Sequence, residues 1–101
     1  MNNLIPIKLL DNIPDLYTTE EQVNPLCHVK LFTPDSNWTW YIIEFSKENR
    51  DICYGYVQGL ENELGYFSLQ ELDSLIGPLG LAVERDLSFT PTVLETIKKV
   101  S

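Results

Sequence analysis

The chain has few of the residues with which proteins bind metals or attack substrates: its 101 residues include two cysteines and one histidine. Neither cysteine belongs to a CxxC pair, and a four-ligand zinc site would need carboxylates in addition. His28 could act as a general base only beside Ser36 and Asp35, which belong to a separate turn without the context of a nucleophile elbow. No glycine-rich phosphate loop is present. The sequence therefore predicts no catalytic residue, no metal site and no cofactor.

Long apolar runs are absent as well. No segment approaches the roughly 18 residues of a membrane-spanning helix, and the opening MNNLIPIKLL lacks the basic start of a signal peptide. We therefore expect a cytoplasmic protein that does not engage a membrane. In that reducing compartment Cys27 and Cys53 are expected to be two buried thiols, with a disulfide between them as the alternative.

Positive charge is scarce. Seven Lys and Arg stand against 15 Asp and Glu, so the net charge is −8, and no Lys or Arg occurs between Asp51 and Glu84. Because nucleic-acid binding needs Lys and Arg to neutralise phosphates, direct binding to nucleic acid is not expected. Solubility is the ordinary reason for such acidity. The more specific interpretation is an acidic face that docks on a basic protein partner or imitates the charge of DNA.

Length and hydrophobic pattern predict a single α+β domain over residues 1–101, built on an antiparallel meander of three or four strands with short helices packed mainly on one face. The segment Trp38–Phe45 is apolar on both sides and should be the central strand, with Trp40 and Phe45 on opposite faces. Ser68 and Glu71 predict a capping box at the start of a helix. The predicted segments are a helix over 6–12, strands over Leu26–Thr33, Trp38–Phe45, Ile52–Gln58 and 65–67, a helix over Leu69–Ile76, an extended edge segment over Gly80–Phe89 and a helix from Pro91.

Two sets of residues are predicted to bind a protein partner. Four aromatic side chains are expected to cluster by cross-strand pairing and to expose one edge, although core packing is the ordinary alternative. Four carboxylates of the base-free window are expected to supply the acidic part of the surface. The two sets are Trp38, Trp40, Tyr54 and Tyr56, and Glu61, Glu63, Glu71 and Asp73.

Five linked motifs run through the chain: LYTTE, FTPDSNWTWY, ELGYFSL, GPLGL and ERDL. Together they resemble an uncharacterised bacterial family, number 2958 in the series of domains of unknown function, over about Leu9 to Phe89. Its members are small acidic proteins common on plasmids, phages and other mobile elements, and some accompany antirestriction or conjugation genes. The resemblance implies mobile-element biology, but it supplies no reaction and no catalytic residues.

The leading hypothesis is therefore a non-enzymatic protein-interaction module of a mobile genetic element, which inhibits a host nucleic-acid-targeting defence protein through its acidic face. We expect a monomer or a weak homodimer, because the edge segment near Glu84–Phe89 leaves strand pairing open. The alternative is a small-ligand-binding or regulatory module whose aromatic cluster lines a pocket. DNA mimicry requires that the four carboxylates are not scattered over opposite faces.

Overall fold

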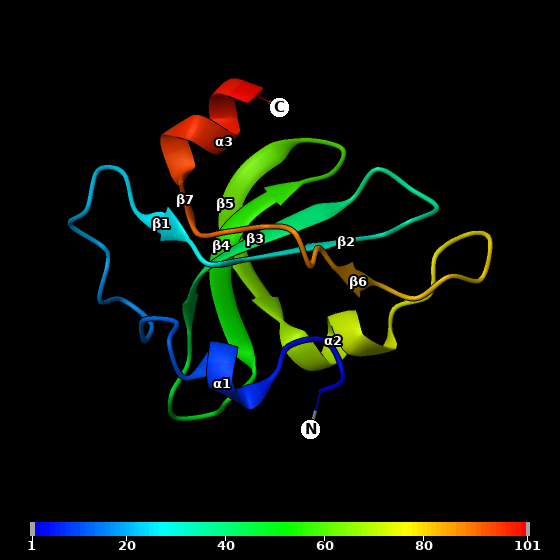
Figure 1. The fold of residues 1–101 in the computed structure, drawn as a ribbon, viewed down its shortest axis with the longest axis horizontal. Helices are drawn as coiled ribbons and strands as arrows, with labels where there is room; N and C mark the ends of the chain where they lie inside the picture. The colour runs from blue at the N-terminus through cyan, green and yellow to red at the C-terminus, as the bar shows by residue number, and fades with distance from the viewer. Residues whose placement is uncertain (1, 101) are drawn as a thin grey trace.

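The computed structural model describes residues 2–100 and shows an α+β domain (Figure 1). Five antiparallel strands form one sheet in the order β5-β4-β3-β2-β6, and β1 and β7 form a separate two-stranded sheet. No helix within residues 2–100 is long and apolar enough to cross a membrane. The elements are α1 (Ile7–Leu10), β1 (Leu26–Cys27), β2 (Val29–Phe32), β3 (Thr39–Phe45), β4 (Ile52–Gln58), β5 (Asn62–Ser68), α2 (Leu69–Ser74), β6 (Glu84–Arg85), β7 (Thr92–Val93) and α3 (Leu94–Val100).

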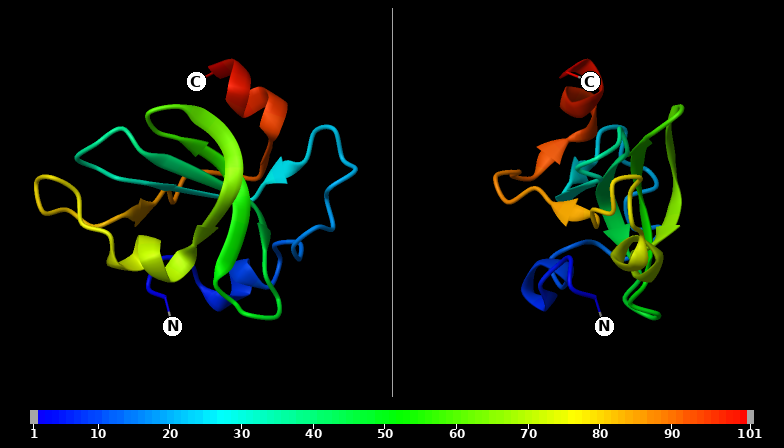
Figure 2. Two further views of the ribbon diagram at one scale, coloured as in Figure 1. Left: turned by 180° about the vertical axis from the view of Figure 1, so that it is seen from behind. Right: turned by 90° about the vertical axis from the view of Figure 1, so that its right-hand side faces the viewer.

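The meander is confirmed, with β3 at the centre of the sheet, but the strand count of three or four was too low. The short strand β6 pairs with β2 and makes the fifth strand at one edge. At the other edge β5 has seven residues rather than the predicted three. Figures 1 and 2 show α1 and α2 at the end of the molecule that holds the N-terminus, and α3 at the opposite end.

Two helix boundaries differ from the prediction for reasons visible in the backbone. The α2 helix starts as predicted, since the Ser68 hydroxyl accepts a hydrogen bond from the Glu71 amide at 3.2 Å. It ends at Ser74, because Leu75 is already extended. The last helix starts three residues later than Pro91, because Thr92 and Val93 pair with β1 instead.

A β-bulge at Ile43 corrects the predicted faces of the central strand. Ile42 pairs with Gly55 and Glu44 pairs with the next residue, Tyr54, so Ile43 is an extra residue on β3. Phe45 consequently pairs with Cys53 and joins the same buried cluster as Trp40. The prediction that Trp40 and Phe45 lie on opposite faces was wrong, because strict alternation does not survive a bulge.

Strand β3 separates two buried clusters, since its successive side chains point to opposite faces of the sheet. The first cluster holds Trp40 and Ile42 together with residues of α1 and α2, and the second holds Tyr41 and Ile43 together with residues of α3. Cys53 belongs to the first cluster and Cys27 to the second. Both are buried free thiols, as predicted, and no disulfide joins them.

The two thiols are expected to resist alkylation in the native protein. Burial raises the pKa of both Cys27 and Cys53 to about 12, so at pH 8 the reactive thiolate is about a thousandfold scarcer than for a free cysteine. Iodoacetamide followed by intact-mass measurement should find an unmodified native chain and a doubly modified chain in denaturing guanidinium chloride. Rapid modification of either cysteine in native buffer would contradict this burial.

Several carboxylates hold the loops to the sheet, so part of the acidity is structural. Asp15 accepts hydrogen bonds from the backbone amides of Leu16 (2.8 Å) and Lys47 (2.9 Å), and these bonds lower the pKa of its carboxyl group. Asp51 accepts from the Ser68 hydroxyl at 2.8 Å and from the Gln70 amide at 2.8 Å. These hydrogen bonds leave the carboxylates charged, but they engage oxygens that would otherwise face solvent.

Candidate interaction surface around Trp38

The turn between β2 and β3 presents the first tryptophan. Thr33 closes this turn, because its backbone N–H donates to the Trp38 carbonyl at 3.0 Å and its hydroxyl accepts from the Trp38 amide at 3.2 Å. The Trp38 ring stacks on Trp40 with centroids 6.0 Å apart and planes inclined by 21°. It also lies over Gly59, where a Cβ would come within 2.3 Å of the ring. Because Trp40 is buried and Trp38 is 39% exposed, the stack runs from the core to the surface.

Asp35 fixes the loop after α2 against this turn. Its Oδ2 accepts hydrogen bonds from the backbone amides of Leu79 at 2.7 Å and Leu81 at 3.3 Å. Its Oδ1 lies against Gly77, where a Cβ would come within 1.8 Å and would displace the Asp35 carboxylate. Gly80 turns the loop at a φ of +85°, a conformation that L side chains rarely adopt. The loop is thus held in one arrangement before any partner arrives.

An apolar groove of about 390 Å³ opens between the tryptophan turn and this loop, and we call it the tryptophan groove. Around it Leu75 is 41% exposed, Ile76 58% and Leu79 79%. Contiguous exposed apolar surface of this kind makes the groove a candidate interaction site. The lining residues carry no charge: Thr33, Ser36, Trp38, Trp40, Leu75, Ile76, Gly77 and Pro78.

Glu61 and Glu63 do not line the tryptophan groove but lie near it, at the same end of the sheet. Trp40 pairs with Val57 and Val57 pairs with Glu63, so these three side chains form one row on the same face of the sheet. Glu61 belongs to the β4–β5 turn, which starts at Gly59 under the Trp38 ring. Both glutamates are exposed, and within residues 2–100 neither forms an ion pair.

The other two predicted carboxylates lie at the far end of β5, on α2. Six residue steps separate Glu63 from the start of α2, which corresponds to roughly 20 Å along the strand. Glu71 is exposed, while Asp73 is half-buried and accepts a hydrogen bond from the Asn3 amide at 3.3 Å. The four carboxylates therefore follow one edge of the sheet as two separate pairs, of which one lies beside the tryptophan groove.

The expected cluster of four aromatic residues does not form. Tyr56 pairs with Tyr41 and belongs to the second buried cluster, while Trp40 belongs to the first. Tyr54 packs against the second cluster and contacts Tyr66, with ring centroids 5.0 Å apart. The two tryptophans and the two tyrosines thus lie on opposite faces, since the pairing register places Tyr41, not Trp40, opposite Tyr56.

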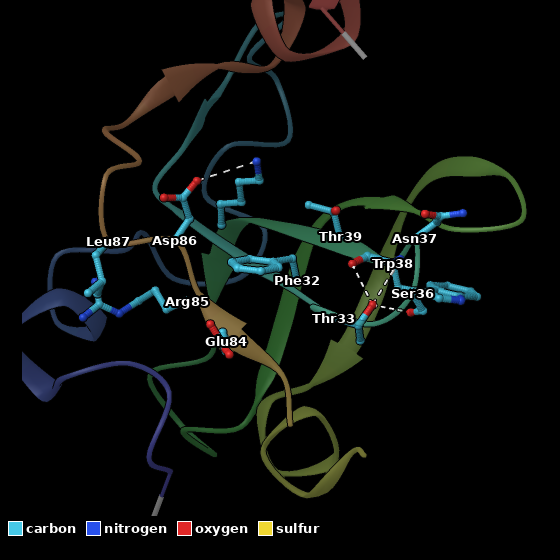
Figure 3. A pocket seen from close by; sticks show the side chains of 11 residues that line it. Phe32, Thr33, Ser36, Asn37, Trp38, Thr39, Glu84, Arg85, Asp86 and Leu87 are labelled. Atoms are coloured by element: carbon cyan, nitrogen blue, oxygen red, sulfur yellow. Dashed lines mark hydrogen bonds and ion pairs between the residues drawn. The ribbon is translucent and has the colours of Figure 1, made fainter. Parts of the chain in front are cut away.

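A wider concavity of about 580 Å³ lies on the other side of the tryptophan turn, between β2 and β6 (Figure 3). Its basic groups are already engaged: Lys30 pairs with Asp86 at 3.7 Å, and Arg85 donates from Nε to the Leu4 carbonyl at 3.1 Å. The Thr33 and Ser36 hydroxyls bond each other. This arrangement gives neither hydroxyl a histidine or carboxylate that would activate it as a nucleophile.

The histidine is placed as a structural residue between β1 and β2. The His28 amide donates to the Ile42 carbonyl at 2.8 Å, and burial lowers the pKa of its imidazole, which is therefore neutral at pH 7. Across residues 2–100, no three His, Cys, Asp or Glu side chains are grouped so that they could hold a metal ion.

Sequence reasoning missed two carboxylates that organise this surface and the opposite face. Asp35 was considered as a neighbour of His28, whereas its carboxylate binds a loop more than 40 residues away. Glu44, which is 2% exposed, was not among the residues predicted to bind a partner. Its position gave a signal, because it is the one charge in the apolar run TWYIIEF.

The fold and the groove define a small α+β domain with an exposed apolar groove and carboxylates at the same end of the sheet. The chain belongs to the protein family described as Protein of unknown function (DUF2958), whose profile matches residues 5–97. This match confirms the resemblance seen in the linked motifs. No curated protein and no solved structure matches the chain.

Proposed function

We propose that the protein is a non-enzymatic interaction module that binds another protein through the tryptophan groove. The observation that carries the proposal is the exposed Trp38 edge, stacked on buried Trp40 and faced by a loop that Asp35 fixes in place. Tryptophan is the residue most enriched among interface hot spots, and a preorganised site avoids part of the entropy cost of binding.

Charge indicates the kind of partner. The groove itself is uncharged, and exposed Glu63 lies two strands from Trp40 in the same row, with Glu61 in the adjoining turn. A partner segment that inserts an apolar anchor side chain and carries Lys or Arg beside it would be complementary to both features. Like-charged surfaces would be repelled by the net charge of −8.

A basic surface is typical of proteins that handle nucleic acids. The finer form of the proposal is therefore that the partner is a nucleic-acid-targeting defence protein of the host, and that the chain serves a mobile genetic element. The resemblance of the linked motifs motivates this role. A DNA-mimicking version is disfavoured, because the carboxylates form two pairs with an apolar groove beside one of them.

The alternative hypothesis, a small-ligand-binding module, depended on a pocket lined by the four aromatic residues, and these residues do not line one pocket. It required Trp38, Trp40, Tyr54 and Tyr56 to line one cavity, and these residues lie on opposite faces of the sheet. We therefore prefer a protein partner for the tryptophan groove.

Selection from a random peptide library tests the proposal even while the partner is unidentified. Immobilised wild-type protein should enrich peptides with one aromatic or large aliphatic residue flanked by Lys or Arg, because only such peptides satisfy both the groove and Glu61 and Glu63. A parallel selection on a Glu61→Gln/Glu63→Gln variant should retain the apolar anchor and lose the basic flank. Enrichment of acidic peptides, or of peptides without an apolar anchor, would contradict the proposal.

A further inference from the structure

A second concavity lies on the face of the sheet opposite the tryptophan groove, and we call it the tyrosine cleft. It has a volume of about 300 Å³ and is lined by strands β3 to β5, by α3 and by the loop between α1 and β1. Buried Glu44 and the rings of Tyr54 and Tyr66 are among its lining residues. The bulge at Ile43 directs Glu44 to this face, where it pairs with Tyr54 across the strands.

The Glu44 carboxylate is held firmly but its charge is not neutralised by a base. Oε1 accepts from the Tyr17 amide at 2.8 Å, and Oε2 accepts from the Thr19 amide at 2.9 Å and the Thr19 hydroxyl at 2.5 Å. Within residues 2–100, no Lys, Arg or His forms an ion pair with it. A buried carboxylate with neutral partners leaves a negative potential, which low-dielectric walls concentrate in the cleft.

Three tyrosine rings continue from this carboxylate to the surface. The Tyr54 and Tyr66 centroids lie 5.0 Å apart with planes inclined by 50°, and the Tyr17 and Tyr66 centroids lie 6.3 Å apart with planes inclined by 54°. The pKa of Tyr66 is raised, first by desolvation and then by its neighbours, which include Tyr17 and Glu44. Desolvation disfavours a charge of either sign, but the contribution of Glu44 reflects a negative potential at the ring, and that potential favours a cation beside it.

Two other tyrosines on the same face make cation–π contacts with lysine side chains of the chain. The Lys30 ammonium lies 5.8 Å from the centre of the Tyr41 ring, and the Lys98 ammonium lies 5.7 Å from the centre of the Tyr56 ring. Within the described chain, no Lys or Arg lies over Tyr54 or Tyr66 in this way. Lys98 also lines the cleft, but its ammonium lies over Tyr56, so the Tyr54 and Tyr66 rings nearest to Glu44 remain open to a cation from outside.

We propose that the tyrosine cleft binds an organic cation, an ammonium or guanidinium group, between the faces of Tyr54 and Tyr66 and the Glu44 carboxylate. Aromatic faces beside a carboxylate are the surroundings in which proteins recognise such cations. The cation is either a free small molecule or a basic side chain of another protein. The inference concerns a different face from the tryptophan groove and does not depend on it.

The test is a titration of ¹⁵N-labelled protein followed by the amide resonances of Tyr17 and Thr19, whose N–H groups donate to Glu44. Choline and agmatine represent free cations, and capped Gly-Lys-Gly and Gly-Arg-Gly peptides represent basic side chains. Sodium chloride at matched ionic strength and a capped Gly-Gln-Gly peptide are the controls. The proposal expects saturable shifts of both amides with at least one cation. The group that binds more tightly, free cations or basic peptides, shows whether the natural ligand is a small molecule or a protein side chain.

Two variants of the half-exposed Tyr66 separate ring recognition from a general charge effect. Tyr66→Phe keeps the aromatic face and should keep the dissociation constant within about twofold, whereas Tyr66→Leu removes the face and should weaken binding about tenfold. Shifts that only follow ionic strength, or that are the same in Tyr66→Leu, would overturn the proposal. Failure of the peptide selection on the tryptophan groove would leave this result unaffected.

Discussion

Gly55→Ala is expected to destabilise the protein by about 3 kcal/mol, a large part of the stability of a domain of this size. A Cβ at this position would come within 1.9 Å of the Tyr41 carbonyl oxygen and 2.9 Å of its carbonyl carbon. Both atoms belong to the backbone of the central strand, so no side-chain rotation relieves the contact. Strand β3 would have to move away from β4, and this movement would shift Trp40 and Glu44, which belong to β3.

The structure provides a matched control directly across the strands. Gly65 pairs with Gly55, and a Cβ on Gly65 would meet nothing within 4 Å. Gly65→Ala should therefore change the free energy of unfolding by less than about 1 kcal/mol, and in the stabilising direction, because alanine restricts the unfolded chain. Urea denaturation of the two variants measures both effects. Equal stabilities would show that β3 and β4 do not approach each other as described.

Glu44→Gln is expected to cost about 2 kcal/mol, although the change adds no volume. The carboxylate accepts two backbone amides and one hydroxyl, and an amide side chain can accept at only one of its two terminal atoms. The new NH2 group faces either the Tyr17 amide or the Thr19 amide, and that amide loses its charge-assisted hydrogen bond. Both bonds hold the loop around Tyr17, whose φ of +70° is a sparsely populated conformation, so the loop should be less restrained in the variant.

Glu63→Gln makes the same chemical change on an exposed strand position of β5 and should leave the free energy of unfolding within about 0.5 kcal/mol. Amide hydrogen exchange adds the local measurement: Tyr17 and Thr19 should exchange faster in Glu44→Gln, while the amides of β4 should not. A Glu44→Gln variant as stable as wild type, with unchanged exchange at Thr19, would show that the carboxylate does not anchor the loop.

Much of the fold follows from local sequence signals. Alternation and turn residues predicted the β2–β5 meander with β3 at its centre, and Ser68 with Glu71 predicted the start of α2. Errors arose where pairing between distant segments decided the outcome. Thr92 and Val93 became a strand because β1 is beside them, and Ile43 became a bulge because the seven residues of β3 pair with only six residues of β4, 53–58. Neither cause is local to the residues concerned.

The candidate site was predicted only in part, because pairing between distant segments also decides which side chains meet there. The tryptophans and Glu61 with Glu63 were identified from type and spacing, and the structure brings them to one end of the sheet. Tyr54 and Tyr56 were assigned to the wrong face, because a one-residue change of register reverses every side chain of a strand. Asp35 and the loop at Gly77 were not connected, since no local pattern predicts a hydrogen bond between positions so far apart.

The central claim, that the tryptophan groove binds a protein segment, is tested most directly by a pair of equivalent charge insertions. Ile76 in the groove is 58% exposed and Ile7 on α1 is 59% exposed, so replacing either by aspartate should spare the fold. Isothermal titration of the most enriched peptide should show at least about tenfold weaker binding to Ile76→Asp. Ile7→Asp should bind within about twofold of wild type. Equal affinities of the two variants would contradict the account and place the binding surface elsewhere.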